Sequence, residues 1–219
     1  MTILYDIKKD AENYARSLHK FPYFTHGRNN VRENLLFFTS PEIQKVIKEA
    51  KDEKEAYQKV INILKNDNGL ASKMEKTKEI LTDEWEKKGK QIISNLEFIF
   101  KKEFPFPDIK VYLTSIPICP HNFKEKYFFV FAMATKTIQL RIIEHELNHF
   151  MFYNYYSQLK NILENEKYEL LKESLTFFSN PEEEGKPNEK ELRKMFMEKI
   201  WNNLDEAINE AVERLKKQK

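Results

Sequence analysis

The residues best suited to catalysis lie in the segment His145–His149, which has the pattern H-E-x-x-H. Two histidines four positions apart on a helix lie on the same face, one above the other. Both imidazoles can therefore bind one metal ion. Glu146 projects close to where a metal-bound water would lie and can act as general base on that water. The pattern predicts a zinc-dependent hydrolase, with a peptidase as the leading expectation.

The chain around this motif has the composition of a buried helix. Apolar residues precede and follow it, and neither glycine nor proline occurs between Thr135 and Ser179. A helix that is apolar on nearly every side is a buried one, so its polar side chains need partners. A metal ion would satisfy all three polar side chains of the motif. The alternative is a helix whose histidines make ordinary hydrogen bonds.

Length and charge narrow the class of protein. A chain of 219 residues can fold as one domain, or as one domain with a helical extension. Its net charge of +2, from 37 basic and 35 acidic residues, gives no reason to expect nucleic acid or an anionic membrane as partner. No segment approaches the roughly 18 consecutive apolar residues that a membrane span needs. The N-terminus becomes charged too soon for a signal peptide.

Cysteine usage points to a reducing compartment. The single cysteine, Cys119, excludes an internal disulfide framework. Its neighbours Pro120 and His121 could suggest a second metal site, but two candidate ligands are too few, and a turn after a strand is expected instead. Together with the charge and the missing signal peptide, this predicts a soluble cytoplasmic protein.

Few glycines and many Lys and Glu residues predict a mostly helical chain. Proline at 105 and 107 ends a helical N-terminal part, after which two β-prone segments follow. We therefore expect an α+β, mostly helical fold, with an N-terminal helical region at 1–105 and a catalytic region at 106–219, or both in one compact domain. The expected helices are 2–20, 41–65, 71–102, the motif helix, 159–178 and 188–215, and an Asn188–Glu191 capping box opens the last of them. The expected strands are 109–114 and 127–134. A turn is expected at 21–27 and a solvated loop at 181–187.

A catalytic zinc site needs a third protein ligand besides the two histidines. The metzincin pattern H-E-x-x-H-x-x-G-x-x-H is absent, because Phe152 stands at its glycine position and Tyr155 at its third histidine. The remaining route is a glutamate on the downstream helix. Glu173 is favoured because small and apolar residues flank it, and Glu169, which shares its face, is the alternative.

Taken with the segment Leu171–Thr176, the motif resembles the glutamate-zincin (gluzincin) metallopeptidases, in which a motif of the type N-E-G-x-A carries the third ligand. The resemblance covers roughly residues 109–179, with Lys172 where many members have Asn and no N-E-x-x-S-D pattern. It implies a zincin-like core of a small sheet, a metal-binding helix and a glutamate helix, binding Zn²⁺. It also implies that 127–134 is an edge strand able to pair with an extended peptide or protein substrate.

Several roles stay open at this level. Tyr153, Tyr156 and His121 are candidates to stabilise an oxyanion. One alternative to a peptidase is a helical interaction protein that keeps a metal site without turnover. Another is a hydrolase of non-peptide amides or esters.

Overall fold

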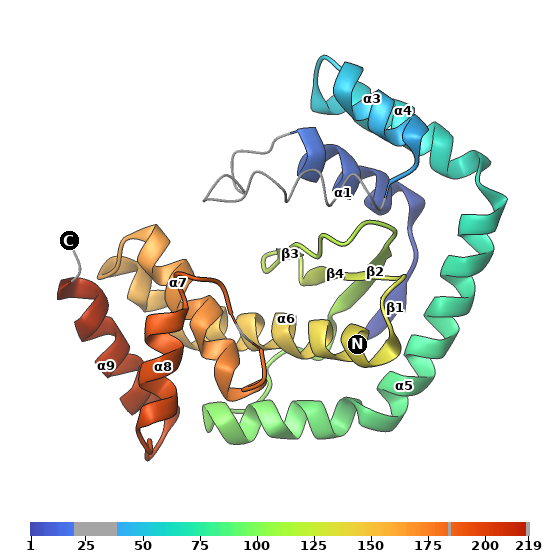
Figure 1. Ribbon diagram of the computed structural model, residues 1–219. Helices are drawn as coiled ribbons and strands as arrows, with labels where there is room; N and C mark the ends of the chain where they lie inside the picture. The colour runs from blue at the N-terminus through green and yellow to red at the C-terminus, as the bar shows by residue number, and fades with distance from the viewer. Residues whose placement is uncertain (20–38, 184, 218–219) are drawn as a thin grey trace. The chain divides into compact units, whose positions relative to one another are not determined.

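Residues 1–19, 39–183 and 185–217 are described by the computed structural model (Figure 1). Helices make up 67% of the structure, and the sheet among the described residues has four strands. The expected α+β, mostly helical class is therefore confirmed. The expected turn at 21–27 lies outside the described residues.

The chain forms two compact units, each built from two separate segments. Unit 1 contains 1–85 and 108–139, and unit 2 contains 86–107 and 140–219. The chain passes from unit 2 to unit 1 after Pro107, close to the boundary expected between residues 105 and 106. That boundary stays a prediction.

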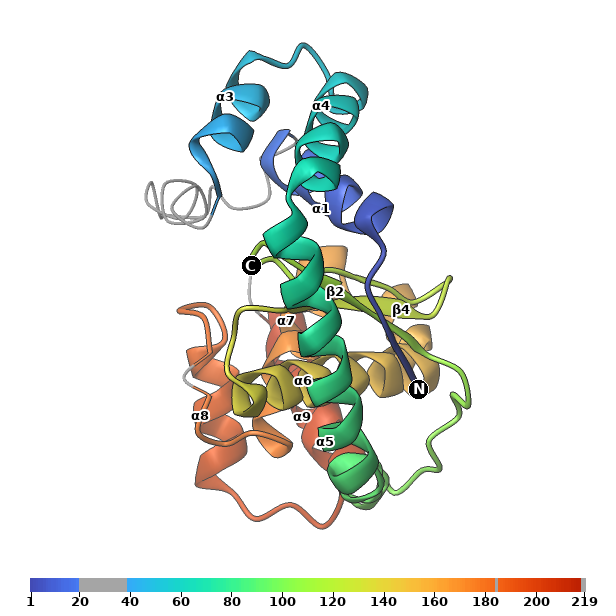
Figure 2. The ribbon, with the colours of Figure 1, turned by 90° about the vertical axis from the view of Figure 1, so that its right-hand side faces the viewer.

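The sheet of unit 1 has the strand order β1-β2-β4-β3. β1, β2 and β4 run parallel to one another, and β3 pairs antiparallel with β4. β2 and β4 lie side by side in Figure 2. The strands are β1 (Thr2–Leu4), β2 (Lys110–Thr114), β3 (His121–Asn122) and β4 (Tyr127–Phe131). The two strands expected near 109–114 and 127–134 are thus confirmed.

Two expectations about the sheet are wrong. Residues 2–4 form a strand rather than the start of a helix over 2–20, because Ile3 is buried by parallel pairing with β2. β4 is not an edge strand, since β3 pairs with its first two residues and the Phe129 amide donates to the Pro120 carbonyl at 3.0 Å. Strand addition at β4 is blocked over this part.

Helices of unit 1 pack on one another through an apolar core of small and branched side chains. The helix expected at 41–65 is two helices, because Asp52 caps a new helix with its side chain on the Glu55 amide. Pro41 does occupy the first turn of its helix, as expected. The helices of this unit are α1 (Ile7–His19), α3 (Pro41–Glu49), α4 (Glu53–Asn66) and the first part of α5 (Asn68–Phe100).

Unit 2 is helical, and it contains the H-E-x-x-H segment. α6 spans Lys136–Tyr156, of which the part from Leu140 belongs to this unit. The helices expected at 159–178 and 188–215 are both interrupted, and the Asn188 side chain does not cap, since the N-cap is Glu189. The elements after α6 are η1 (Ser157–Asn161), α7 (Asn165–Leu175), η2 (Thr176–Phe178), α8 (Lys190–Glu198) and α9 (Leu204–Lys217).

An aromatic core holds α6 in unit 2. Phe150 meets Phe106 edge-on, with ring centroids 5.5 Å apart. Phe152 packs against Tyr168 of α7, with centroids 5.0 Å apart. Because these rings are almost fully buried, they fix α7 against the half of α6 that carries the motif. Within the described residues, no helix is both long and apolar enough to cross a membrane.

A buried carboxylate joins α1 to the end of β2 in unit 1. Asp10 is fully buried and accepts hydrogen bonds from the Thr114 hydroxyl at 2.7 Å and from the Ser115 amide and hydroxyl at 3.0 and 2.7 Å. Burial raises the pKa of Asp10 to about 6 although these donors act in the opposite direction. Protonation of Asp10 is therefore coupled to folding.

Replacing Asp10 by Asn should change how stability depends on pH. Because the pKa is raised in the folded state, the stability that Asp10 contributes is largest below about pH 4 and is lost as the pH rises through 6. Relative to Asp10→Asn, the wild-type free energy of unfolding should fall by about 2 kcal/mol between about pH 4 and pH 7. Denaturant titrations across this range measure it. Asp83→Asn, at an exposed position, controls for the lost charge, and parallel wild-type and Asp10→Asn curves would contradict the assignment.

Candidate metal centre

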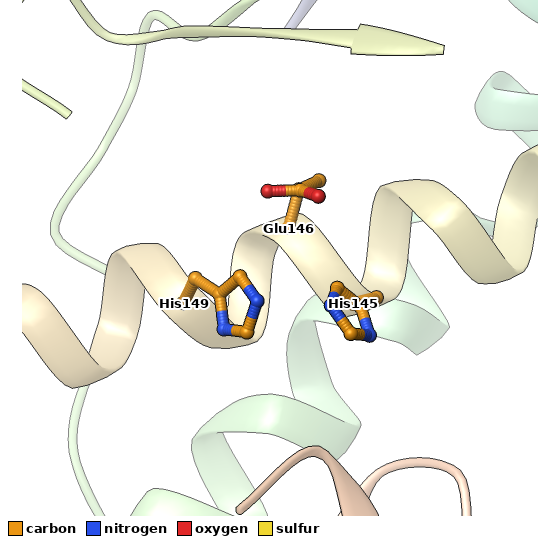
Figure 3. Close-up of side chains that lie close together, drawn as sticks. All are labelled: His145, Glu146 and His149. Carbon is orange, nitrogen blue, oxygen red and sulfur yellow. The ribbon is translucent and has the colours of Figure 1, made fainter. Parts of the chain in front are cut away.

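α6 brings the three polar side chains of the motif together (Figure 3). The imidazole rings of His145 and His149 lie with centroids 4.4 Å apart at an interplanar angle of 76°. One potential ligand atom from each of His145, Glu146 and His149 lies within 4.8 Å of the other two. The juxtaposition follows from the four-residue spacing on a helix, as the sequence predicts.

The motif is buried from Glu146 onward, and only its first residue, His145, is partly exposed. His149 is 1% exposed and Glu146 6%, whereas the His145 side chain is 24% exposed. The helix is not buried all round, because Ile138, which shares the histidine side in the sequence pattern, is exposed. One imidazole therefore lies in the interior while the other remains in reach of solvent.

α7 places the carboxylate of Glu173 against both imidazoles. Glu173 Oε1 lies 3.4 Å from His149 Nε2, and Glu173 Oε2 lies 3.9 Å from His145 Nε2. Glu169 makes other contacts, with the Tyr153 hydroxyl at 3.1 Å and Lys172 Nζ at 2.8 Å. Of the two glutamates considered from the sequence, Glu173 is the one that approaches both histidines, although its role as a ligand stays a prediction.

Two lysines neutralise Glu173. Lys172 Nζ lies 3.1 Å from Glu173 Oε1, and Lys186 Nζ lies 3.2 Å from Glu173 Oε2. Burial alone would raise the pKa of Glu173, but the His149 hydrogen bond and the two lysine charges hold this pKa well below its ordinary value. Glu173 is thus an ionised carboxylate at neutral pH, which is the form that binds a metal.

The buried cation Lys172 joins several groups of α6 and α7. Its side chain is 4% exposed and donates to the Tyr153 hydroxyl at 3.1 Å. Burial alone would lower the pKa of Lys172, but Glu173, Tyr153 and Glu169 raise this pKa above its ordinary value. The sequence pattern does not predict that Lys172 is buried. It shows only that Lys172 stands where many glutamate-zincins have asparagine.

The surroundings shift the pKa values of the two histidines in opposite directions. Burial, together with the charges of His145 and Lys172, lowers the pKa of His149 to about 3. Burial acts in the same direction on His145, but Glu183, Glu146 and Glu173 outweigh it and raise the pKa of His145. At neutral pH His149 is therefore a neutral imidazole, as a metal ligand must be.

Glu183 is a site residue that the sequence analysis missed. The sequence predicts a solvated loop at 181–187, and Glu182 is indeed exposed, but Glu183 Oε2 lies 3.5 Å from His145 Nδ1. Burial works to raise the pKa of Glu183, whereas His145 and Arg193 lower this pKa to about 2. A run of three glutamates in a loop carries no signal that one of them turns inward.

Of the three oxyanion candidates, Tyr153 is connected to the site through Lys172, which contacts both its hydroxyl and Glu173. The Tyr156 hydroxyl donates to Asp205 at 2.5 Å, and burial raises the pKa of Tyr156. Burial likewise raises the pKa of Tyr153, to about 12. His121 lies in β3 of unit 1. Half-buried Cys119 lies between β2 and β3, and the cluster of potential metal ligands found among the described residues does not include it.

The donor set fits a zinc ion. Two imidazoles and one carboxylate from two packed helices are the ligand types of a catalytic zinc site. One Glu173 oxygen lies 3.4 Å from His149 Nε2, and the other lies 3.9 Å from His145 Nε2. The groups that would hold the ion are therefore already close together.

Comparison with known proteins adds no assignment. A scan against protein-family models found no matching family. Searches among curated proteins and among solved structures also found no match. The resemblance to glutamate-zincins stays a prediction based on the residues quoted above, and the function has to be inferred from the site itself.

Zinc affinity should distinguish Glu173 from Glu169. Glu173→Gln should weaken zinc binding by more than about 100-fold, because it removes a ligand rather than an outer hydrogen-bond partner. Glu169→Gln, four residues away on the same helix, is the matched control and should stay within about tenfold of wild type. Competition with a chromophoric chelator measures both. Equal affinities in the two variants would contradict the assignment of Glu173.

Proposed function

We propose that this protein is a zinc-dependent hydrolase, most directly a metallopeptidase with a zincin-like core, in which His145, His149 and Glu173 hold the ion. The observation that carries the proposal is the approach of one carboxylate to the Nε2 atoms of both histidines of an H-E-x-x-H helix. Neutral His149 and ionised Glu173 are the forms that bind a cation. Zinc held there would act as a Lewis acid and lower the pKa of a coordinated water toward about 7.

Glu146 is the proposed general base. Its carboxylate lies beside both imidazoles and is 6% exposed, so bulk water competes little for it. It would take a proton from the attacking water and pass it to the leaving amine. Positioned acid–base groups of this kind contribute about 10²–10⁴-fold to the rate.

The proposed substrate is a peptide or protein. This follows from the resemblance of the motif and its glutamate helix to peptidases. The near-balanced charge of the chain gives no reason to propose nucleic acid or a membrane surface as partner.

A second candidate function has one observation in its favour. Lys172 and Lys186 satisfy Glu173 without a metal, as they would in a binding protein whose charge network is purely structural. In that case the protein would be a non-catalytic helical interaction module. Catalysis and metal binding therefore need separate measurements.

Glu146→Gln separates the two candidates. The variant should lose hydrolysis of a peptide library by about 10²-fold or more, while its zinc content remains that of wild type. Glu144→Gln, two residues earlier on α6, is the control and should retain activity. Hydrolysis that is equal in wild type and Glu146→Gln would contradict the enzyme assignment. Profiling of ester and non-peptide amide substrates with the same pair tests the remaining alternative.

A further inference from the structure

The two nitrogens of His145 contact different carboxylates. Nε2 lies 3.9 Å from Glu173, the proposed ligand, and Nδ1 lies 3.5 Å from Glu183 in the loop after η2. An imidazole binds a metal through one nitrogen, and an acceptor at the other nitrogen fixes the tautomer and the ring orientation. Glu183 is placed to accept from Nδ1–H, which leaves the Nε2 lone pair on the side of Glu173.

A buried arginine holds Glu183 in this place. Arg193 of α8 is 5% exposed. Its guanidinium donates to the Glu183 carbonyl at 2.8 Å and to Glu183 Oε2 at 3.4 Å. Thr176 Oγ1, at the end of the glutamate helix, lies 3.1 Å from the same Oε2 and 2.7 Å from the guanidinium. The carboxylate is thus fixed from two sides.

The same arginine reaches the helix that carries Glu173. Arg193 also donates to the Glu173 carbonyl at 3.2 Å and pairs with the buried Glu189 at 3.1 Å. One guanidinium therefore connects the backbone of the proposed ligand with the side chain that contacts His145. Glu183 therefore belongs to the site, although Pro181, Glu182 and Lys186 of the same loop are exposed as expected.

Gly185 makes room for this arginine. Its φ of +67° lies in the left-handed region, which other residues rarely adopt. A Cβ at this position would collide with the Arg193 side chain and would lie 2.8 Å from Glu189 Oε2. A larger residue at 185 would displace Arg193 and with it the support of Glu183.

We propose that Glu183 is a positioning residue for the metal centre: held by Arg193 and Thr176, it fixes His145 with Nε2 toward the ion. This inference rests on the proposed zinc site. It gives Glu183, which is not itself a proposed ligand, a role in metal affinity. Loss of such an outer partner typically weakens metal binding by about 10–100-fold.

The direct test compares Glu183→Gln and Glu183→Ala with wild type in zinc competition against a chelator. Gln keeps the size of the side chain and an acceptor for Arg193 but loses the charge, so zinc affinity should fall in the order wild type, Gln, Ala, with about 10–100-fold lost in Ala. Glu182→Gln, at the exposed neighbouring position, should bind zinc as wild type does. NMR of the zinc-loaded protein should show a solvent-protected Nδ1–H proton of His145 in wild type and not in Glu183→Ala, a signal that a merely structural role would not remove.

Gly185→Ala provides a second test that leaves every carboxylate in place. It should also weaken zinc binding, whereas Gly69→Ala at the start of α5 should not. If the Glu183 variants fail to fold, this pair decides. Zinc affinities within twofold of wild type for both Glu183 variants, or for Gly185→Ala, would overturn the inference while leaving the proposed function intact. A wild-type protein that binds no zinc would instead overturn the proposed function itself.

Discussion

The contact on which the site depends is the approach of the Glu173 carboxylate to two imidazole nitrogens of α6. It exists because aromatic packing between Phe152 and Tyr168 fixes α7 against α6. A partly buried carboxylate beside a buried neutral imidazole is costly unless cations compensate it. The surrounding charges of unit 2 supply this compensation.

The compensating cations have a consequence for metal binding. Lys172 and Lys186 stabilise ionised Glu173 when no metal is bound, and an incoming cation has to share or displace them. Lys186 is exposed and can move away, whereas Lys172 is buried and also held by Tyr153 and Glu169. In the proposed zinc site, a cation fixed next to the Glu173 carboxylate would reduce metal affinity and make a bound ion a stronger Lewis acid, since it withdraws charge from the carboxylate.

The sequence was sufficient for features that depend on local spacing. The helical face shared by His145 and His149 follows from a four-residue interval, and the strands near 109–114 and 127–134 follow from β-prone composition. Features set by tertiary contact were not accessible. Residues 2–4 became a strand by pairing with β2, and Glu183 reached His145 because Arg193, ten residues later, turns its loop inward.

The most direct test of the account is the zinc content of the purified protein, measured by atomic emission in wild type and in His145→Ala. A two-histidine, one-glutamate site predicts about one zinc ion per wild-type chain, and a large loss in His145→Ala with the fold retained by circular dichroism. An equal, near-zero zinc content in both proteins, even after incubation with zinc and removal of the excess, would contradict the account.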